Sequence, residues 1–195
     1  MKLKKGNIIG FIREKKIGKF LSIITGLFGI ILFSLSLFLR PFGWWSVNFT
    51  ADWLFSPLNG ITFISAIGST TSTSSLLNGL FLPWLFYFSG IIYLHGSVFI
   101  TLSAYKESRI FALLSAFMMI GGLCLFCIAL ATFPLFLAYA ALGFSISGNV
   151  YSGSSYLWAV GTLTWGLTNA FWVAVASSVI ALIVTILDLV LNFKK

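Results

Sequence analysis

The sequence predicts an all-α membrane protein, a bundle of four transmembrane helices with two long loops on the outer side. Of its 195 residues, 59% are hydrophobic and only 8% are charged, whereas soluble domains carry about 25% charged residues. Four apolar runs are each close to the roughly 20 residues that a spanning helix needs. The basic residues gather at the ends of these runs. The net charge of +8 therefore indicates topology and anionic headgroups rather than nucleic acid.

Residues 1–19 form a basic tail in which lysine and arginine alternate with isoleucine and phenylalanine. This spacing fits a short amphipathic helix on the headgroups, or a frayed tail. The first span, 20–39, contains no charged residue, and we expect it to stay uncleaved. The second, 82–103, begins with Pro83 and Trp84, which suit a first helical turn and an interfacial anchor.

A very short polar turn at 105–109 separates the second span from the third, which we expect over 110–133. Two helices joined by so few residues are antiparallel neighbours. Pro134 marks a kink or end of the third span. The fourth span, 170–192, is followed by two lysines, so a single membrane domain covers 20–193.

The distribution of basic residues predicts the orientation. Eleven of the twelve Lys and Arg residues lie in the N-terminal tail, the 105–109 turn or the C-terminus, and only Arg40 lies on the opposite side. Cytoplasmic flanks are rich in Lys and Arg. We therefore expect a multi-pass protein of the cell membrane with both termini in the cytoplasm and the loops 40–81 and 134–169 outside.

The two outer loops carry only Arg40 and Asp52 as charged residues. A nearly uncharged exterior suits an acidic or hot habitat, as of an archaeon, or burial against partners. Asn59-Gly60 and Gly148-Asn149 lie between short apolar or alternating segments, which is typical of hairpin turns. We therefore predict a small extracellular β-layer to which both loops contribute.

Aromatic residues in the loops form a candidate contact surface, because aromatic side chains anchor many protein interfaces. These residues are Trp44, Trp45 and Trp53 in the first loop, with Tyr151, Tyr156 and Trp158 in the second. The triplet Asn48-Phe49-Thr50 is also an N-glycosylation sequon on the predicted outer side. Its closeness to the first span limits access by the glycosylating enzyme.

Cys124-Leu125-Phe126-Cys127 is the sharpest motif in the chain. A rise of 1.5 Å per residue from Arg109 places these cysteines about 22 to 27 Å across a core about 30 Å thick, in the outer half of the third helix. The pair resembles the C-x-x-C of quinone-linked disulfide-generating enzymes, which also need a second cysteine pair that this chain lacks. Plain packing is the alternative.

His95 and Asp188 are the ionisable groups expected inside the spans, where such groups are costly. For His95 we expect a neutral imidazole bonded to Ser115, Ser177 or Ser178; a haem site with Met118 or Met119 is the alternative. Asp188 either pairs with basic residues at the inner headgroups or lines an ion pathway. We see no motif for a metal or a cofactor.

Small residues repeat at a spacing of four within two spans, which allows close helix approach. The pairs are Ser22 with Gly26, Thr25 with Gly29, Ala174 with Ser178, and Ser177 with Ala181. We expect them to form seams inside the bundle first and oligomer contacts second.

The order of tail, long loop, turn, loop and tail, together with Trp44-Trp45, resembles claudin-like tetraspan proteins. That resemblance implies a small outer sheet that mediates contacts, although the family's pair of loop cysteines is absent here. The leading hypothesis is a non-enzymatic protein that works through contacts with protein partners or further copies, as a surface protein or a subunit of a membrane complex. A thiol or quinone oxidoreductase using Cys124 and Cys127, and a small pore or carrier, are the alternatives.

Overall fold

The computed structural model describes residues 15–39, 42–51, 60–64, 70–72, 84–131, 145–149, 151–157 and 161–192. Four long helices and six strands make up these residues. The helices are α2 (Lys15–Phe38), α3 (Trp84–Lys106), α4 (Arg109–Ala131) and α6 (Asn169–Asn192). The strands are β1 (Trp45–Ala51), β2 (Gly60–Ile64), β3 (Thr70–Ser72), β4 (Ser145–Asn149), β5 (Ser152–Leu157) and β6 (Gly161–Leu167).

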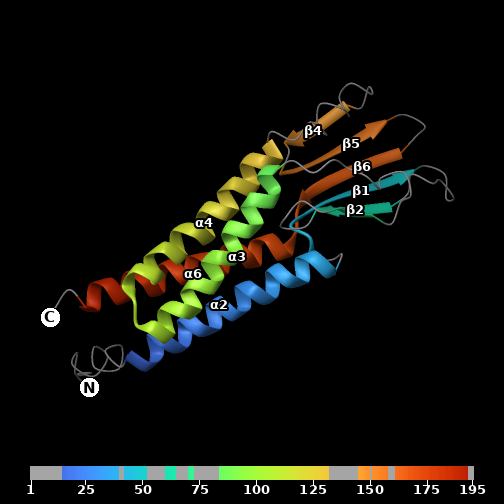
Figure 1. The fold of residues 1–195 in the computed structure, drawn as a ribbon. Helices are drawn as coiled ribbons and strands as arrows, with labels where there is room; N and C mark the ends of the chain where they lie inside the picture. The colour runs from blue at the N-terminus through green and yellow to red at the C-terminus, as the bar shows by residue number, and fades with distance from the viewer. Residues whose placement is uncertain are drawn as a thin grey trace, which may run out of the picture.

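Each of the four helices is long and apolar enough to cross a membrane, as the sequence predicts. At 1.5 Å per residue, a helix of 23 residues is about 34 Å long, which exceeds the roughly 30 Å hydrocarbon core. Their outward faces are apolar, with Phe20 at 62%, Phe117 at 70% and Ile183 at 50% of full exposure. The start of α2, the α3–α4 turn and the end of α6 lie at one end of the bundle, and the sheet lies at the other (Figure 1).

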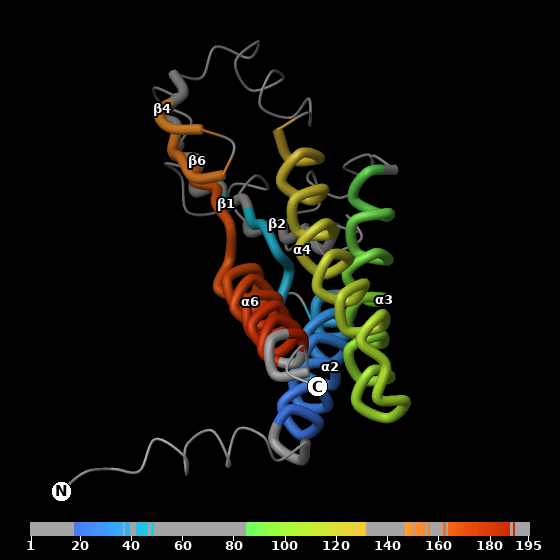
Figure 2. Tube along the Cα trace, turned by 90° about the vertical axis from the view of Figure 1, so that its left-hand side faces the viewer, coloured from blue at the N-terminus to red at the C-terminus, as the bar shows by residue number. Residues whose placement is uncertain are grey.

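The helices form a ring in which α2 packs on α3, α3 on α4, α4 on α6, and α6 back on α2 (Figure 2). The predicted small-residue seams lie inside this ring: both pairs on α2 and both pairs on α6 are buried. Gly122 shows why a small residue is needed, because a Cβ there would lie 2.7 Å from the Ser89 carbonyl oxygen and 2.8 Å from the Tyr93 nitrogen. Backbone contact of this kind holds α3 and α4 close together.

Hydroxyl groups, rather than charges, supply the polarity between the helices. Most of these hydroxyls bond to a carbonyl three or four residues earlier in the same helix, as Ser97 does to Tyr93. Two hydroxyls that bond within α6 also join helices: the Ser177 hydroxyl lies 2.8 Å from the Tyr93 hydroxyl, and the Thr185 hydroxyl lies 3.1 Å from the Ala112 carbonyl, to which it donates. These bonds tie α6 to α3 and to α4 without a buried charge.

The strands form one antiparallel sheet in the order β3-β2-β1-β6-β5-β4. The sheet confirms the prediction that both loops contribute to one β-layer. β1 from the first loop pairs with β6 from the second along its whole length, from Trp45 opposite Leu167 to Ala51 opposite Gly161. The Gly148-Asn149 signal marks the β4–β5 hairpin, whereas Asn59 and the segment 53–55 lie outside the described residues.

The sheet joins the bundle through a short, hydrogen-bonded connection. Thr168 is the one residue between β6 and α6. Its amide donates to the Trp44 carbonyl at 3.1 Å, and its hydroxyl donates to the Gly43 carbonyl. The same hydroxyl oxygen accepts from the Phe171 amide at 3.4 Å, as an N-cap does. The start of β1 and the start of α6 are thereby fixed to each other.

Candidate contact surface and intramembrane residues

Across β1, β6, β5 and β4, one face of the sheet is built from polar, uncharged residues, whereas the register puts Ile61 and Phe63 of β2 on this same face. In an antiparallel sheet, residues opposite each other share a face, and alternate residues along a strand do so too. The register thus places these residues, which we call the polar sheet face, on one side: Ser46, Asn48, Ser147, Asn149, Ser152, Ser154, Tyr156, Thr162 and Thr164. The β4, β5 and β6 members are exposed, and the two β1 members are half-buried.

The opposite face of the sheet holds two buried tryptophans, Trp45 and Trp165, with exposed fractions of 3% and 8%. The indole nitrogen of Trp165 donates to the Asn149 carbonyl at 2.6 Å. A Cβ on Gly153 would run into the Trp165 ring, so β5 needs glycine at this position. The two tryptophans and the polar sheet face thus lie on opposite sides of the sheet.

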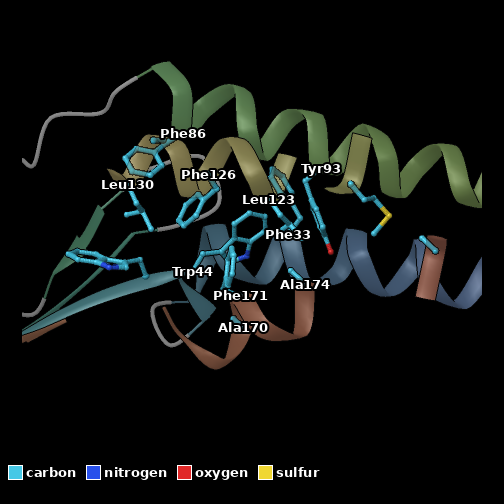
Figure 3. Packing of buried hydrophobic residues seen from close by; sticks show 14 of the residues in the cluster. Phe33, Trp44, Phe86, Tyr93, Leu123, Phe126, Leu130, Ala170, Phe171 and Ala174 are labelled. Carbon is cyan, nitrogen blue, oxygen red and sulfur yellow. The ribbon is translucent and has the colours of Figure 1, made fainter. Parts of the chain in front are cut away.

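Trp44 and Trp45 are not surface residues, which corrects the expectation that they belong to a contact surface. Trp44 is completely buried and packs edge-on against Tyr93, Phe126 and Phe171, with ring centroids 5.2, 5.1 and 6.0 Å away (Figure 3). The segment that leads into β1 therefore starts inside the bundle, at the end near the sheet. Because three of the four helices converge there, large rings are needed to fill the space.

The indole nitrogen of Trp44 has no hydrogen-bond partner among the described residues. A buried N–H without a partner costs about 1–3 kcal/mol. The contacts that the structure gives this side chain are with the aromatic rings of Tyr93, Phe126 and Phe171. We infer that shape, rather than hydrogen bonding, selects tryptophan at this position.

The other predicted contact residues differ in their exposure. Tyr156 lies on the polar sheet face and is 45% exposed. Tyr151 is half-buried, and its hydroxyl donates to the Cys127 carbonyl at 3.1 Å, which ties the β4–β5 turn to α4. Trp53 and Trp158 lie outside the described residues.

Asn48, the sequon asparagine, lies in the middle of β1 with Ile61 of β2 on one side and Thr164 of β6 on the other. Its side chain is half-buried on the polar sheet face. An attached glycan would project from the centre of that face.

Both cysteines are free thiols on the last turns of α4; Cys124 is exposed and Cys127 is half-buried. The helix places them one turn apart, toward the end of α4 that lies near the sheet; their position on the outer side of the membrane stays a prediction. Within the described parts of the chain, no three His, Cys, Asp or Glu residues come together to hold a metal ion.

His95 faces outward from the bundle rather than toward the expected serines. Its Nδ1 lies 2.8 Å from the Ile91 carbonyl one turn earlier. A carbonyl only accepts, so Nδ1 is the donor. The expected partners are engaged elsewhere: Ser177 bonds to Tyr93, Ser178 donates to the Ala174 carbonyl, and Ser115 lies 4.0 Å from the Met119 sulfur. The bond to its own helix satisfies one ring nitrogen without help from another helix.

The charged residues of the described chain gather at the bundle end away from the sheet. Lys19 of α2 forms an ion pair of 2.5 Å with Glu107 in the α3–α4 turn. Glu107 has a positive φ of 52°, the left-handed conformation that often ends a helix. Asp188 lies toward the same end of α6. Its place at the inner headgroups and its pairing stay predictions.

Neither family models nor curated proteins match this sequence. The class to which the protein belongs is therefore derived from its fold alone. Four apolar helices in a ring, with lipid-facing apolar surfaces and one antiparallel sheet at one end, define a multi-pass membrane protein with a tetraspan layout. The bilayer is its environment.

Proposed function

We propose that this protein works through contacts made by its polar sheet face, as a surface protein or a small subunit of a membrane complex. The observation that carries the proposal is the register of the sheet, which brings uncharged Ser, Thr, Asn and Tyr side chains from four adjacent strands onto one side. The centres of protein interfaces are depleted of charge. Hydroxyl and amide groups can be buried against a partner at much lower cost than charges.

The way in which the sheet is attached to the helix bundle supports the same proposal. β1 and β6 pair in full, and both are fixed to the bundle through Thr168. A surface held in one shape loses little conformational entropy on binding. We place this surface outside the cell membrane and both termini in the cytoplasm, because basic residues flank the opposite end of the bundle.

Site-specific photo-crosslinking in native membranes tests the contact function. A photoreactive amino acid replaces Ser154 on the polar sheet face. As a lipid-facing control, the same amino acid replaces Phe117, which lies on the face of α4 that points away from the other helices. We expect discrete protein adducts from position 154, whose mass identifies a second copy or another chain, and lipid adducts from position 117. An absence of protein adducts from positions 154, 156 and 164 alike would contradict the proposal.

A charge placed on the face sharpens this test. Thr164→Asp should reduce adduct formation at position 154 about tenfold or more, because a carboxylate buried without a partner costs several kcal/mol. Tyr105→Asp, at an exposed position on the opposite end of the bundle, should leave the yield unchanged. The double variant Cys124→Ala, Cys127→Ala should also retain the adducts; their loss would favour the thiol alternative.

A further inference from the structure

An open groove lies where the sheet meets the helices. It has a volume of about 630 Å³ and is lined by Cys127 of α4, Asn149, Tyr151 and Ser152 of the β4–β5 hairpin, Gly166 and Leu167 of β6, and Phe171 and Trp172 of α6. We call it the junction groove. From its position and chemistry, we propose that it holds one membrane lipid with an uncharged head rich in hydroxyl groups, such as a glycosyl diacylglycerol.

The lower part of the groove matches a hydrocarbon chain. Leu167, Phe171 and Trp172 line it with apolar atoms, and Trp172 is 57% exposed. Along α6 this wall continues directly into Val173, Val179 and Ile180, which are exposed apolar residues of the spanning helix. The groove is therefore open to the acyl chains at the outer boundary of the bilayer, where a lipid chain is the available apolar partner.

The upper part of the groove matches a polar head. The Oδ1 atom of Asn149 accepts from the amides of Tyr151 and Ser152 at 2.9 and 3.1 Å. The two hydrogens on Nδ2 are thus left to donate to an oxygen of a ligand. Ser152, which is directly opposite Asn149 in the β4–β5 register, is exposed and also lines the groove.

The head should be neutral, since none of the described residues that line the groove is charged. A phosphate-bearing head is normally met by Arg or Lys. The polar sheet face continues beyond the groove. Ser154 and Thr164 are the next residues on that face after Ser152 and Gly166. A sugar head can exchange hydrogen bonds with these hydroxyls at no cost of burying charge. This inference needs the helices to span the membrane, but it does not rest on the contact function.

Photoactivatable lipids in proteoliposomes test the proposal. One probe is a monoglucosyl diacylglycerol with a diazirine in one acyl chain, and the other is phosphatidylglycerol with the same chain. We expect the neutral probe to label the peptides that contain Cys127 or Phe171 several-fold more than the anionic probe does. Equal labelling by both probes, or labelling that simply follows the exposure of the helix faces, would overturn the inference.

Two variants and a control make the assignment specific. A Cβ at Gly166 would lie 3.5 Å from the Tyr151 carbonyl oxygen, an ordinary contact, so Gly166→Leu fills the groove without a backbone clash. We expect it to lower neutral-probe labelling at least fivefold. Thr162→Leu, on the same strand and face, should not lower it. Unchanged labelling in Gly166→Leu would count against the groove.

Asn149→Asp is a second variant that tests the same groove if Gly166→Leu fails to fold. The carboxylate keeps the acceptor that the turn amides need, removes the two Nδ2 donors and adds a charge. We expect neutral-probe labelling to fall several-fold in this variant as well. Labelling at the wild-type level would refute the part assigned to Asn149.

Discussion

Trp44 fills the space in which three helices and the first strand meet. Trp44→Ala should lower the free energy of unfolding by about 3–5 kcal/mol, because it removes a large buried ring and leaves a cavity. Trp172→Ala is the matched control, since that ring is 57% exposed. Thermal unfolding in mild detergent measures both. Equal melting temperatures for the two variants would contradict the assignment of Trp44 to the core.

Two adjacent glycines of α4 provide a second test at the scale of single residues. A Cβ at Gly122 would meet backbone atoms of α3, whereas a Cβ at Gly121 would have nothing within 4 Å. Gly122→Ala should therefore destabilise the protein by about 1–3 kcal/mol through overpacking. Gly121→Ala should be neutral or stabilise it by about 0.4–1 kcal/mol. Detergent-solubilised melting curves distinguish them, and a larger loss in Gly121→Ala would contradict the α3–α4 packing.

At the scale of elements, the pairing of β1 with β6 makes one sheet from two loops. In a background with Cys124→Ser and Cys127→Ser, the pair Asn48→Cys and Thr164→Cys should form a disulfide on mild oxidation, because these residues are directly opposite. Opposite Cβ atoms lie about 4.5–5.5 Å apart, and diagonal ones about 7–8 Å. Asn48→Cys with Thr162→Cys should therefore oxidise more slowly. Loss of thiol labelling measures the bond; equal rates would argue against this register.

The helices were the easiest elements to predict from the sequence. The predicted spans 82–103 and 110–133 correspond to α3 (Trp84–Lys106) and α4 (Arg109–Ala131), with differences of three residues or fewer at their described ends. Long apolar runs fix the type of element, and the charged residues Lys106 and Arg109 fix the limits at the turn between α3 and α4. The extension of α2 back to Lys15 was missed, since a helix can continue past the last apolar residue into the headgroup region.

The sheet and its surface were predicted only in outline. β6 was not predicted as a strand, although Thr162, Thr164 and the apolar residues between them alternate with period two. The same alternation at Ser46, Asn48 and Ser152, Ser154 would have indicated the polar sheet face. The burial of Trp44 and Trp45 could not be predicted from this alternation. Their burial depends on where the first loop starts relative to three distant helices.

Considered as a whole molecule, the protein has two ends that differ in chemistry. The start of α2 and the turn between α3 and α4 lie at the end away from the sheet (Figure 1), and these segments contain Lys19, Lys106 and Arg109. In a Cys124→Ser, Cys127→Ser background, a membrane-impermeant maleimide should label Ser154→Cys in intact cells. It should label Tyr105→Cys only after the cells are permeabilised, since both positions are exposed but lie at opposite ends. Labelling of Tyr105→Cys in intact cells, with labelling of Ser154→Cys only after permeabilisation, would show that the proposed orientation is wrong.

The β1–β6 pairing has a consequence for the order of assembly. More than one hundred residues, including α3 and α4, separate the two strands in the chain. During synthesis, β1 must therefore wait without its β6 partner until the second loop has been made, and such long-range pairing is slow. Asn48 stays accessible in an open strand for that interval. In a cell with the glycosylating enzymes, we expect any modification of Asn48 to occur during synthesis, before the sheet closes around it.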